Sequence, residues 1–471
     1  MLVPLNFTGG FSQHKAAVVS NQRNRNFWPQ RTEPKSKSQY ILKSFYGLKL
    51  FASWSEGYDR GMIRANGVIY RISGPKLLQV ASDGTHTELG SIDGTGRCIF
   101  DVIQDEIIIV NDLGDIYVWN GTTLTENTDP DIGTPNGVAV LNNQAVYDNG
   151  TGDGWSISDV GTPLTVNGLN YASAESAPDA LVLPVAYRET LTLFGEETIE
   201  FWWNSGNGNP PLDRIQGAVS ENGLAAKHSV AKTPDYLFYF GSDRQVHAMT
   251  GGTASVDQVI STPNLASLFQ TFTTFDDAVG WAMLLEGVWF YVLTFPTQDR
   301  TFVFPVGGEW FEWGTGSQGR IRANSYVFVF NKHIVADHES GNLYELDANT
   351  YTDVEETIIR TRQTAPIHGA LLNAPGKEFE LNSLELNMKV GVGTLTDPGI
   401  EPKVYVSASR DSGETFGTER FVSVGRRGDS QKKVRFGSFG RFTSSCVLRI
   451  RVSDPVEWVI LDGQAEAEVC V

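Results

Sequence analysis

Ala65-Asn-Gly-Val-Ile-Tyr70 and Asn111-Asp-Leu-Gly-Asp-Ile-Tyr117 share the pattern that decides the fold: a strand ends in a Gly/Asp/Asn turn, and a strand with an apolar-aromatic pair follows. The pattern recurs in Gly195-Glu-Glu-Thr-Ile-Glu-Phe201, Gly241-Ser-Asp-Arg-Gln-Val-His247 and Glu339-Ser-Gly-Asn-Leu-Tyr344. Asn, Asp and Gly favour the backbone angles of tight hairpin turns. Turn-bounded strands at blade-sized intervals predict a β-propeller, a fold that hosts many functions and does not by itself give one.

The composition also favours strands and turns over long helices. Apolar residues make up 41% of the 471 residues, and 26 Phe, 15 Tyr and 11 Trp can fill a large core. The 48 Gly and 20 Pro predict many turns. Apolar residues alternate in short runs, as in 404–409 and 447–452, and almost no stretch has the spacing of an amphipathic helix. We therefore expect an all-β protein.

Repeat spacing divides the expected propeller, residues 49–360, into about seven units. Their starts lie near residues 50, 97, 136, 180, 224, 276 and 320, so each unit has the ~40–50 residues of a four-stranded blade. The registers are blurred, and counts of six or eight stay open. A closed ring removes exposed sheet edges, and we expect it to close by pairing a terminal strand with the last blade.

The segments on either side of the propeller differ from it in composition. Residues 1–48 are rich in Asn, Gln, Arg and Lys and predict an extended N-terminal arm, with one strand near 40–45. This arm is the candidate for the strand that closes the ring. Proline-bounded segments at 364–369 and 374–376 mark the next boundary. Residues 361–471 contain about six alternating strands and predict a C-terminal antiparallel β-sandwich-like domain.

The net charge of −18 limits the partners of the chain. Phosphate neutralisation requires basic surface, so binding of free DNA is disfavoured. The charge fits either a solubilising surface or a pore through which DNA slides without sticking. The N-terminus lacks a signal-peptide pattern, and the longest apolar runs are far shorter than a membrane span. We expect a protein kept in the cytosol, with no membrane insertion, unless something carries it out in another way.

Residues able to carry chemistry form no recognised catalytic or metal motif. The three cysteines, Cys98, Cys446 and Cys470, lack the spacing of a disulfide framework or a zinc site. The densest metal-like cluster is His333, Asp337, His338 and Glu339. Its spacing fits no ligand motif, and we expect it in a solvated hairpin. Without a nucleophile elbow or a phosphate-binding loop, we expect no enzyme activity and no cofactor.

Ser409-Arg-Asp411-Ser-Gly413-Glu-Thr415-Phe416 matches the Asp-box pattern Ser-x-Asp-x-Gly-x-Thr-aromatic. In this pattern the Asp caps turn amides, the Gly takes a positive φ, and the aromatic ring anchors the hairpin. Sialidases carry several such boxes away from their catalytic residues, whereas this chain has one box outside the expected propeller. We interpret it as a structural hairpin. It also motivates a rival hypothesis, a glycan-binding or glycan-hydrolysing β-propeller protein.

Positive charge gathers in one part of the sandwich region, at Arg426, Arg427, Lys432, Lys433, Arg435 and Arg441. Charged strand edges that prevent edge-to-edge pairing would explain it. A docking surface for an acidic partner would explain it equally. We predict this basic set as the partner-binding residues of the chain.

A resemblance to a known family rests on the stretch from Asn136 to Trp203. Its blocks are Gly154-Trp155-Ser-Ile-Ser158, Tyr171-Ala-Ser-Ala-Glu175-Ser-Ala-Pro178-Asp179, Val185-Ala-Tyr-Arg188-Glu and Leu193-Phe194-Gly195-Glu-Glu-Thr198-Ile199-Glu200-Phe201-Trp202. The C-terminal part adds 407–417, Val434-Arg435, Gly440-Arg441 and Leu448-Arg-Ile-Arg451-Val. In this order the chain resembles the packaged-DNA stabilisation proteins of short-tailed bacteriophages (podoviruses), which are tail hub or nozzle proteins.

The resemblance implies a propeller followed by a C-terminal β domain, in a virion tail protein that is not an enzyme. It implies a homo-hexamer below the portal-connector (adaptor) ring that extends the DNA channel and holds packaged DNA in the head. It further implies contacts with a tail needle or tip plug and with tailspikes or fibres, while DNA passes through the lumen without specific binding. Assembly in the host cytoplasm needs no signal peptide. We expect the N-terminal arm and the basic set to contact the connector or a neighbouring copy.

Overall fold

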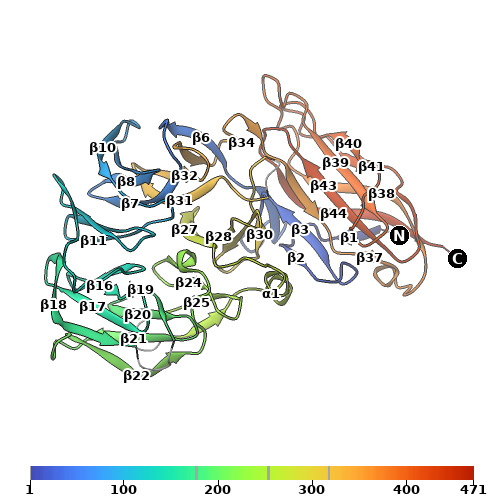
Figure 1. The fold of residues 1–471 in the computed structure, drawn as a ribbon. Coiled ribbons are helices and arrows are strands. Elements are labelled where there is room, and N and C mark those ends of the chain that lie inside the picture. Colours follow the sequence, from blue (N-terminus) through green and yellow to red (C-terminus); the bar gives the residue numbers. More distant parts are fainter. Residues whose placement is uncertain (1, 175–178, 252–254, 317–318, 471) are drawn as a thin grey trace.

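Blades arranged in a ring form the larger part of the molecule, and a β-sandwich stands at one side of the ring (Figure 1). The computed structural model describes residues 2–174, 179–251, 255–316 and 319–470. Residues 175–178, part of the stretch that carried the family resemblance, lie outside the described residues. The predicted all-β fold of a propeller and a sandwich is confirmed.

Within the described residues, six blades are each built from four consecutive antiparallel strands. The first two comprise β7 (Asp59–Ala65), β8 (Val68–Ser73), β9 (Lys76–Val80) and β10 (His86–Ser91), then β11 (Ile99–Ile103), β12 (Glu106–Val110), β13 (Ile116–Trp119) and β14 (Leu124–Glu126). The next two comprise β15 (Val138–Leu141), β16 (Gln144–Asp148), β17 (Gly154–Asp159) and β18 (Thr162–Ser173), then β19 (Leu181–Tyr187), β20 (Thr190–Gly195), β21 (Ile199–Asn204) and β22 (Leu212–Ser220). The last two comprise β23 (Ala231–Lys232), β24 (Leu237–Phe240), β25 (Val246–Met249) and β26 (Asp257–Val259), then β27 (Val279–Leu285), β28 (Val288–Phe295), β29 (Arg300–Pro305) and β30 (Phe311–Glu312).

The ring is completed by a unit that borrows a strand from the N-terminal side of the chain. Its own strands are β31 (Ala323–Val329), β32 (Lys332–Asp337) and β33 (Leu343–Asp347), and its fourth is β6 (Gly47–Ala52), antiparallel to β33. Two short strands, β34 (Thr352–Asp353) and β35 (Glu356–Thr357), extend this sheet. The prediction of about seven blades is therefore wrong: six blades are each built from four consecutive strands, and the unit near residue 320 has three strands of its own. A local turn pattern cannot show which distant segment supplies a fourth strand.

The hairpin turns that predicted the fold have the expected backbone. Asn66 and Gly67 have φ angles of 50° and 78°, the pair of positive values that a tight two-residue hairpin requires. The strands that they join pack blade against blade. Ile72 of β8 and Ile109 of β12 belong to one buried cluster between the first two blades. Full burial of such a side chain contributes about 1.5–3 kcal/mol. The apolar contacts between neighbouring blades therefore contribute much of the stability of the ring.

Two sheets face each other in the sandwich. One contains β38 (Phe379–Met388), β44 (Val459–Val469), β41 (Val434–Phe436) and β42 (Gly440–Phe442). The other contains β36 (Arg360–Gln363), β43 (Ser445–Val452), β39 (Lys403–Ser409) and β40 (Arg420–Ser423), with β37 (Ile367–His368) beside β43. Leu384, Val404 and Leu448 meet in the buried core between the sheets.

Helical segments are short in the described part of the chain. The α-helix α1 (Pro263–Phe269) begins after Thr262, whose hydroxyl accepts a hydrogen bond from the amide of Leu265. Proline suits the first helical position because an N–H group there would have no partner within the helix, so nothing is lost when proline lacks it. The 3₁₀ turns η1 (Lys227–Ser229) and η2 (Gly369–Leu372) are shorter still.

The N-terminal residues expected to form an extended arm are strands of both domains. β1 (Leu2–Leu5) pairs with β44, and β4 (Phe27–Arg31) and β5 (Tyr40–Ser44) continue the same sandwich sheet. The strand expected near 40–45 thus lies in the sandwich, and β6 closes the ring instead. β2 (Ser12–Gln13) pairs with β3 (Asn21–Arg25), and β3 lies between β30 and β36. One continuous sheet therefore runs from a propeller blade into the sandwich.

A buried carboxylate fixes β3 to the blade. Glu312 of β30 accepts hydrogen bonds from Arg23 Nε and Nη2, both at 3.0 Å, and from Arg300 Nη2 at 2.6 Å. Burial alone would raise the pKa of Glu312, but the positive charges of Arg300 and Arg23 outweigh it and lower the pKa to about 2. The carboxylate is therefore ionised at neutral pH and compensates two guanidinium groups.

Glu312→Gln is expected to lower the free energy of unfolding by about 3 kcal/mol, because it leaves two guanidinium groups without their carboxylate. The folded-state pKa of Glu312 lies below its ordinary value of 4.5, so its stabilisation is full above about pH 4.5 and is lost as pH falls towards 2. Urea unfolding at pH 7 and at pH 3 measures both effects. The control is Glu414→Gln, on an exposed loop. If Glu312→Gln lowered the free energy of unfolding no more than Glu414→Gln did, at pH 7 and at pH 3 alike, this role of Glu312 would be contradicted.

Candidate functional site

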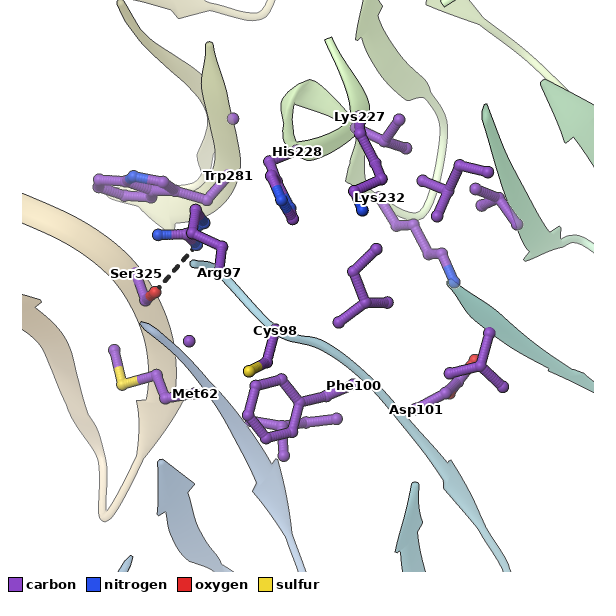
Figure 2. Close-up of a pocket in the computed structure, with 18 of the residues that line it drawn as sticks. Met62, Arg97, Cys98, Phe100, Asp101, Lys227, His228, Lys232, Trp281 and Ser325 are labelled. Carbon is purple, nitrogen blue, oxygen red and sulfur yellow. Dashed lines mark hydrogen bonds between the residues drawn. The ribbon is translucent and has the colours of Figure 1, made fainter. Parts of the chain in front are cut away.

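The first strands of the blades line a cavity on the propeller axis, which we call the axial cavity (Figure 2). Its volume is about 260 Å³. Its walls come from β7, β11, β15, β19, β23, β27 and β31 and from the segment around η1. First strands of neighbouring blades contact each other, as β7 does with β11 and β31, which brings residues far apart in the sequence to one place.

Basic side chains dominate the polar lining of the axial cavity. Arg97 lies beside Trp281, and Lys227 and His228 enter from η1 (Figure 2). The Nζ of Lys227 donates a hydrogen bond to the carbonyl oxygen of Asn136 at 3.2 Å. Burial lowers the pKa of Lys227 and of Arg97. Burial, with help from the nearby cations, holds the pKa of His228 well below its usual value, so this imidazole is neutral at pH 7.

A polar junction beside the axial cavity ties the first blade to the last unit of the ring. Asp59 of β7 is fully buried and accepts hydrogen bonds from Ser325 Oγ at 2.5 Å and Asn324 Nδ2 at 3.3 Å, both on β31. Arg97 Nη1 lies 3.8 Å from Asp59, and Arg97 Nη2 donates to Ser325 Oγ at 3.2 Å (Figure 2). The junction thus joins three strands that the chain reaches at widely separated points.

The chemistry that the axial cavity can support is narrow. Asp101 is the one carboxylate among its described lining residues, and it accepts hydrogen bonds from the amides of Val102 and Val140, both at 2.8 Å. Glycoside hydrolysis usually needs two carboxylates across the substrate, which this cavity does not bring together. Its volume equals that of roughly nine water molecules. Partly desolvated cations in such a space suit a small anion or bound water.

Two family models account for nearly the whole chain. Residues 1–351 match the β-propeller of bacteriophage P22 Gp10, and residues 366–468 match the β-sandwich of the same protein. The chain belongs to the bacteriophage P22 Gp10 family. Its members are phage proteins, so this chain is a structural protein of a phage tail, and the resemblance noted in the sequence is confirmed.

Solved structures with a similar backbone are propellers of diverse origin. The computationally designed protein Ika8 has a TM-score of 0.39 and 12% identity, over 69% of this chain and 100% of that one. The WD40 domain of Neurospora crassa Pan2 has a TM-score of 0.43 and 8% identity, over 69% of this chain and 100% of that one. Likeness at this level carries no argument about the Gp10-family chain. No curated protein matches it.

The predicted basic set lies on and beside one sheet of the Gp10-family sandwich, and three of its six residues lie within 4 Å of a carboxylate. Arg441 pairs with Glu378, Arg435 lies 3.4 Å from Glu466, and Arg426 lies 3.9 Å from Glu401. The other members, Arg427, Lys432 and Lys433, are exposed. The set is thus spread over the loop before β41 and over β41 and β42, and its role as a partner site stays a prediction.

The Asp-box residues form a hydrogen-bonded turn after β39. The carboxylate of Asp411 accepts from Ser409 Oγ at 2.6 Å and from the amide of Thr415 at 2.9 Å, and these bonds hold its pKa well below the usual range. Gly413 has a φ of 90°, and its carbonyl oxygen accepts from Asn21 Nδ2 at 3.1 Å. Phe416 packs against the guanidinium of Arg449 at 4.1 Å. The turn therefore contacts the N-terminal strands and lies outside the propeller.

The histidine-acid cluster serves turns and stacking. Asp337 accepts hydrogen bonds from the amide of Glu339 at 3.0 Å and from Ser340 Oγ at 2.7 Å, and His333 Nδ1 lies 2.9 Å from the hydroxyl of Tyr326. Across the described residues, no group of three or more His, Cys, Asp or Glu side chains is arranged to hold a metal ion. In the same residues, no helix has the length and apolar character needed to cross a membrane.

Sequence reasoning did not single out the lining of the axial cavity. Six expected unit starts, near 97, 136, 180, 224, 276 and 320, fall within about five residues of lining positions, because the first strand of each blade is the innermost. These positions are Arg97, Val138, Leu183, Lys227, Trp281 and Asn324. Unit starts are therefore the signal by which such residues can be found.

Asp59→Asn is expected to lower the free energy of unfolding of the full chain by about 2 kcal/mol, because hydrogen bonds to a charged, buried acceptor become neutral ones. Arg97 would also lose its nearest carboxylate. Urea unfolding followed by tryptophan fluorescence measures the change. Asp105→Asn, on an exposed turn, is the matched control. An unfolding midpoint equal to that of the control would contradict the proposed junction.

Proposed function

We propose that this Gp10-family chain is a tail hub (nozzle) protein. Six copies form a homo-hexameric ring below the portal-connector (adaptor) ring, extend the DNA channel and stabilise packaged DNA in the head. The observation that carries the proposal is the match of both domains, in order, to one phage protein. In the virion tail, after assembly in the host cytoplasm, the ring also meets a tail needle or tip plug and tailspikes or fibres. A head-to-tail ring of identical copies closes by rotation.

Charge supports a channel that does not hold DNA. Each copy carries a net charge of −18, so six copies carry roughly 100 net negative charges that repel the phosphate backbone. The axial cavity of one propeller, at about 260 Å³, is too small for a duplex whose major groove alone is about 12 Å wide. In this proposal DNA passes through an opening shared by the six copies, and not through a propeller axis.

The glycan hypothesis has less support from the arrangement of side chains. The Asp-box turn belongs to the sandwich and contacts β3 and β43. The axial cavity offers one carboxylate among its described lining residues, and that side chain is bonded to backbone amides. Cleavage of host surface polysaccharide by the purified chain would nevertheless favour this hypothesis over the tail-hub proposal.

Mixing the chain with its connector ring is expected to give a complex with about six added copies per connector. Size exclusion with multi-angle light scattering measures the mass of the chain alone, of the connector alone and of the mixture. A hexamer of the chain alone would show that the ring forms before docking. Failure to join an intact connector would contradict the hub proposal.

Reversing charge in the basic set is expected to reduce incorporation into particles several-fold, because an acidic partner surface would then be repelled. The variant is Lys432→Glu, Lys433→Glu and Arg435→Glu combined. The control carries the same change in charge on the propeller: Arg64→Glu, Lys76→Glu and Arg188→Glu. Quantification of the chain in purified particles measures the effect. Equal incorporation of the two variants would remove the basic set as the docking site.

A further inference from the structure

Four arginines share one face of the sheet that joins the propeller to the sandwich. In this sheet β36 lies between β3 and β43, with Gln363 opposite Arg23 on one side and Arg449 on the other. Residues two apart on a strand lie on the same face. This face, which we call the arginine face, consists of Arg23, Arg25, Thr361, Gln363, Arg449 and Arg451. With Glu419, these residues line a cavity of about 310 Å³.

The arginine face holds more positive than negative charge. Glu312 is already bonded to Arg23 and to Arg300. Glu419 accepts from Arg451 Nε at 2.9 Å and lies 3.7 Å from Arg449 Nη2. Five guanidinium groups therefore surround these two carboxylates, and Asp299 adds a third negative charge near Arg25. This excess stands out in a chain with a net charge of −18.

The cost of crowding these cations is visible at Arg449. Burial lowers the pKa of Arg449, and the neighbouring charge of Arg451 lowers it further against the opposing effect of Glu419. An anion brought into the cavity would compensate the buried charge of Arg449 and offset the like-charge repulsion. The site is thus short of negative charge at neutral pH.

Aromatic rings hold the guanidinium groups of the arginine face in place. Arg449 lies over Phe416 at 4.1 Å, and Arg451 lies over Tyr405 at 5.1 Å. A planar guanidinium stacked on a ring presents its donors in a fixed fork, so less side-chain freedom is lost when an anion binds. Phe421 lies 5.8 Å from Tyr405 and is 58% exposed, which gives the rim an apolar edge.

The size of the arginine face, and the contact that Glu419 already makes with it, favour a protein carboxylate over a nucleic-acid strand as its ligand. Three adjacent strands and two rungs span only about 10 by 7 Å, whereas a nucleic-acid strand is bound along an extended basic track. Glu419 already accepts from both Nε and Nη2 of Arg451, the two-pronged contact that a carboxylate makes with arginine. We propose that the arginine face docks an acidic segment of a partner protein, whose carboxylates join Glu419 among the arginines. This proposal does not depend on a hexameric ring.

Binding of a fluorescein-labelled hexaglutamate peptide to the full chain, followed by fluorescence anisotropy at low salt, tests the proposal. Arg449→Gln combined with Arg451→Gln is expected to weaken binding at least tenfold. Arg64→Gln combined with Arg188→Gln removes the same charge from the exposed surface of the propeller and is expected to leave binding unchanged. Circular dichroism confirms that each variant folds.

Glu419→Gln provides an arm that removes no arginine. It removes the carboxylate that competes with the peptide for Arg451, and it is expected to tighten peptide binding three- to tenfold. Absence of binding by the unaltered chain, or equal loss in both double-arginine variants, would overturn the proposal. A labelled oligothymidylate that bound as tightly as the peptide, with the same dependence on Arg449 and Arg451, would assign the face to nucleic acid and overturn it as well.

Discussion

The position of β3 between β30 and β36 is the contact on which the relation between the two domains depends. Its backbone pairing to the propeller is slight, a single parallel pair between Arg25 and Glu312. Side chains supply the rest. Glu312 binds Arg23 and Arg300, and Arg362 of β36 donates to the carbonyl oxygens of Phe7 at 2.9 Å and Gly10 at 2.8 Å. Rotation of the propeller against the sandwich would therefore break buried, charged hydrogen bonds, so these contacts oppose it.

Buried arginines donate to irregular backbone in more than one part of the fold. Arg60, almost fully buried, donates to the carbonyl oxygens of Gly96 at 2.7 Å, Ile92 at 3.0 Å and Asp93 at 2.6 Å, between the first two blades. A guanidinium has five donors and no acceptor, so one side chain can satisfy several carbonyls that have no strand partner. A fold with many tight turns produces such carbonyls in number, and leaving them unpaired would be costly. The same residue type thus closes seams in the propeller and at the domain junction.

Local patterns in the sequence predicted the fold well and the sites poorly. Turns such as Asn66-Gly67 determine their own hairpins, so strand order within six blades followed directly. The strand β6 could not be assigned to the last unit, because its pairing with β33 depends on the closed ring. The arginine face joins residues from 23 to 451, and no window of sequence contains it. Conversely, the basic set lies within one stretch of sequence, 426–441, yet Glu378 and Glu466 reach Arg441 and Arg435 only in the folded sheet.

The two strands supplied by the N-terminal side have a consequence for how the chain is made. β6 leaves the ribosome about 300 residues before β33, its partner, which at ~5–20 residues per second is a wait of roughly 15–60 s. β1 waits still longer, until β44 near the end of the chain is synthesised. During translation both strands present unpaired edges that another nascent chain of the same kind could occupy. When many ribosomes translate one mRNA, neighbouring nascent chains would therefore tend to exchange these strands. The yield of correctly folded single chains should fall as the number of ribosomes on each mRNA rises.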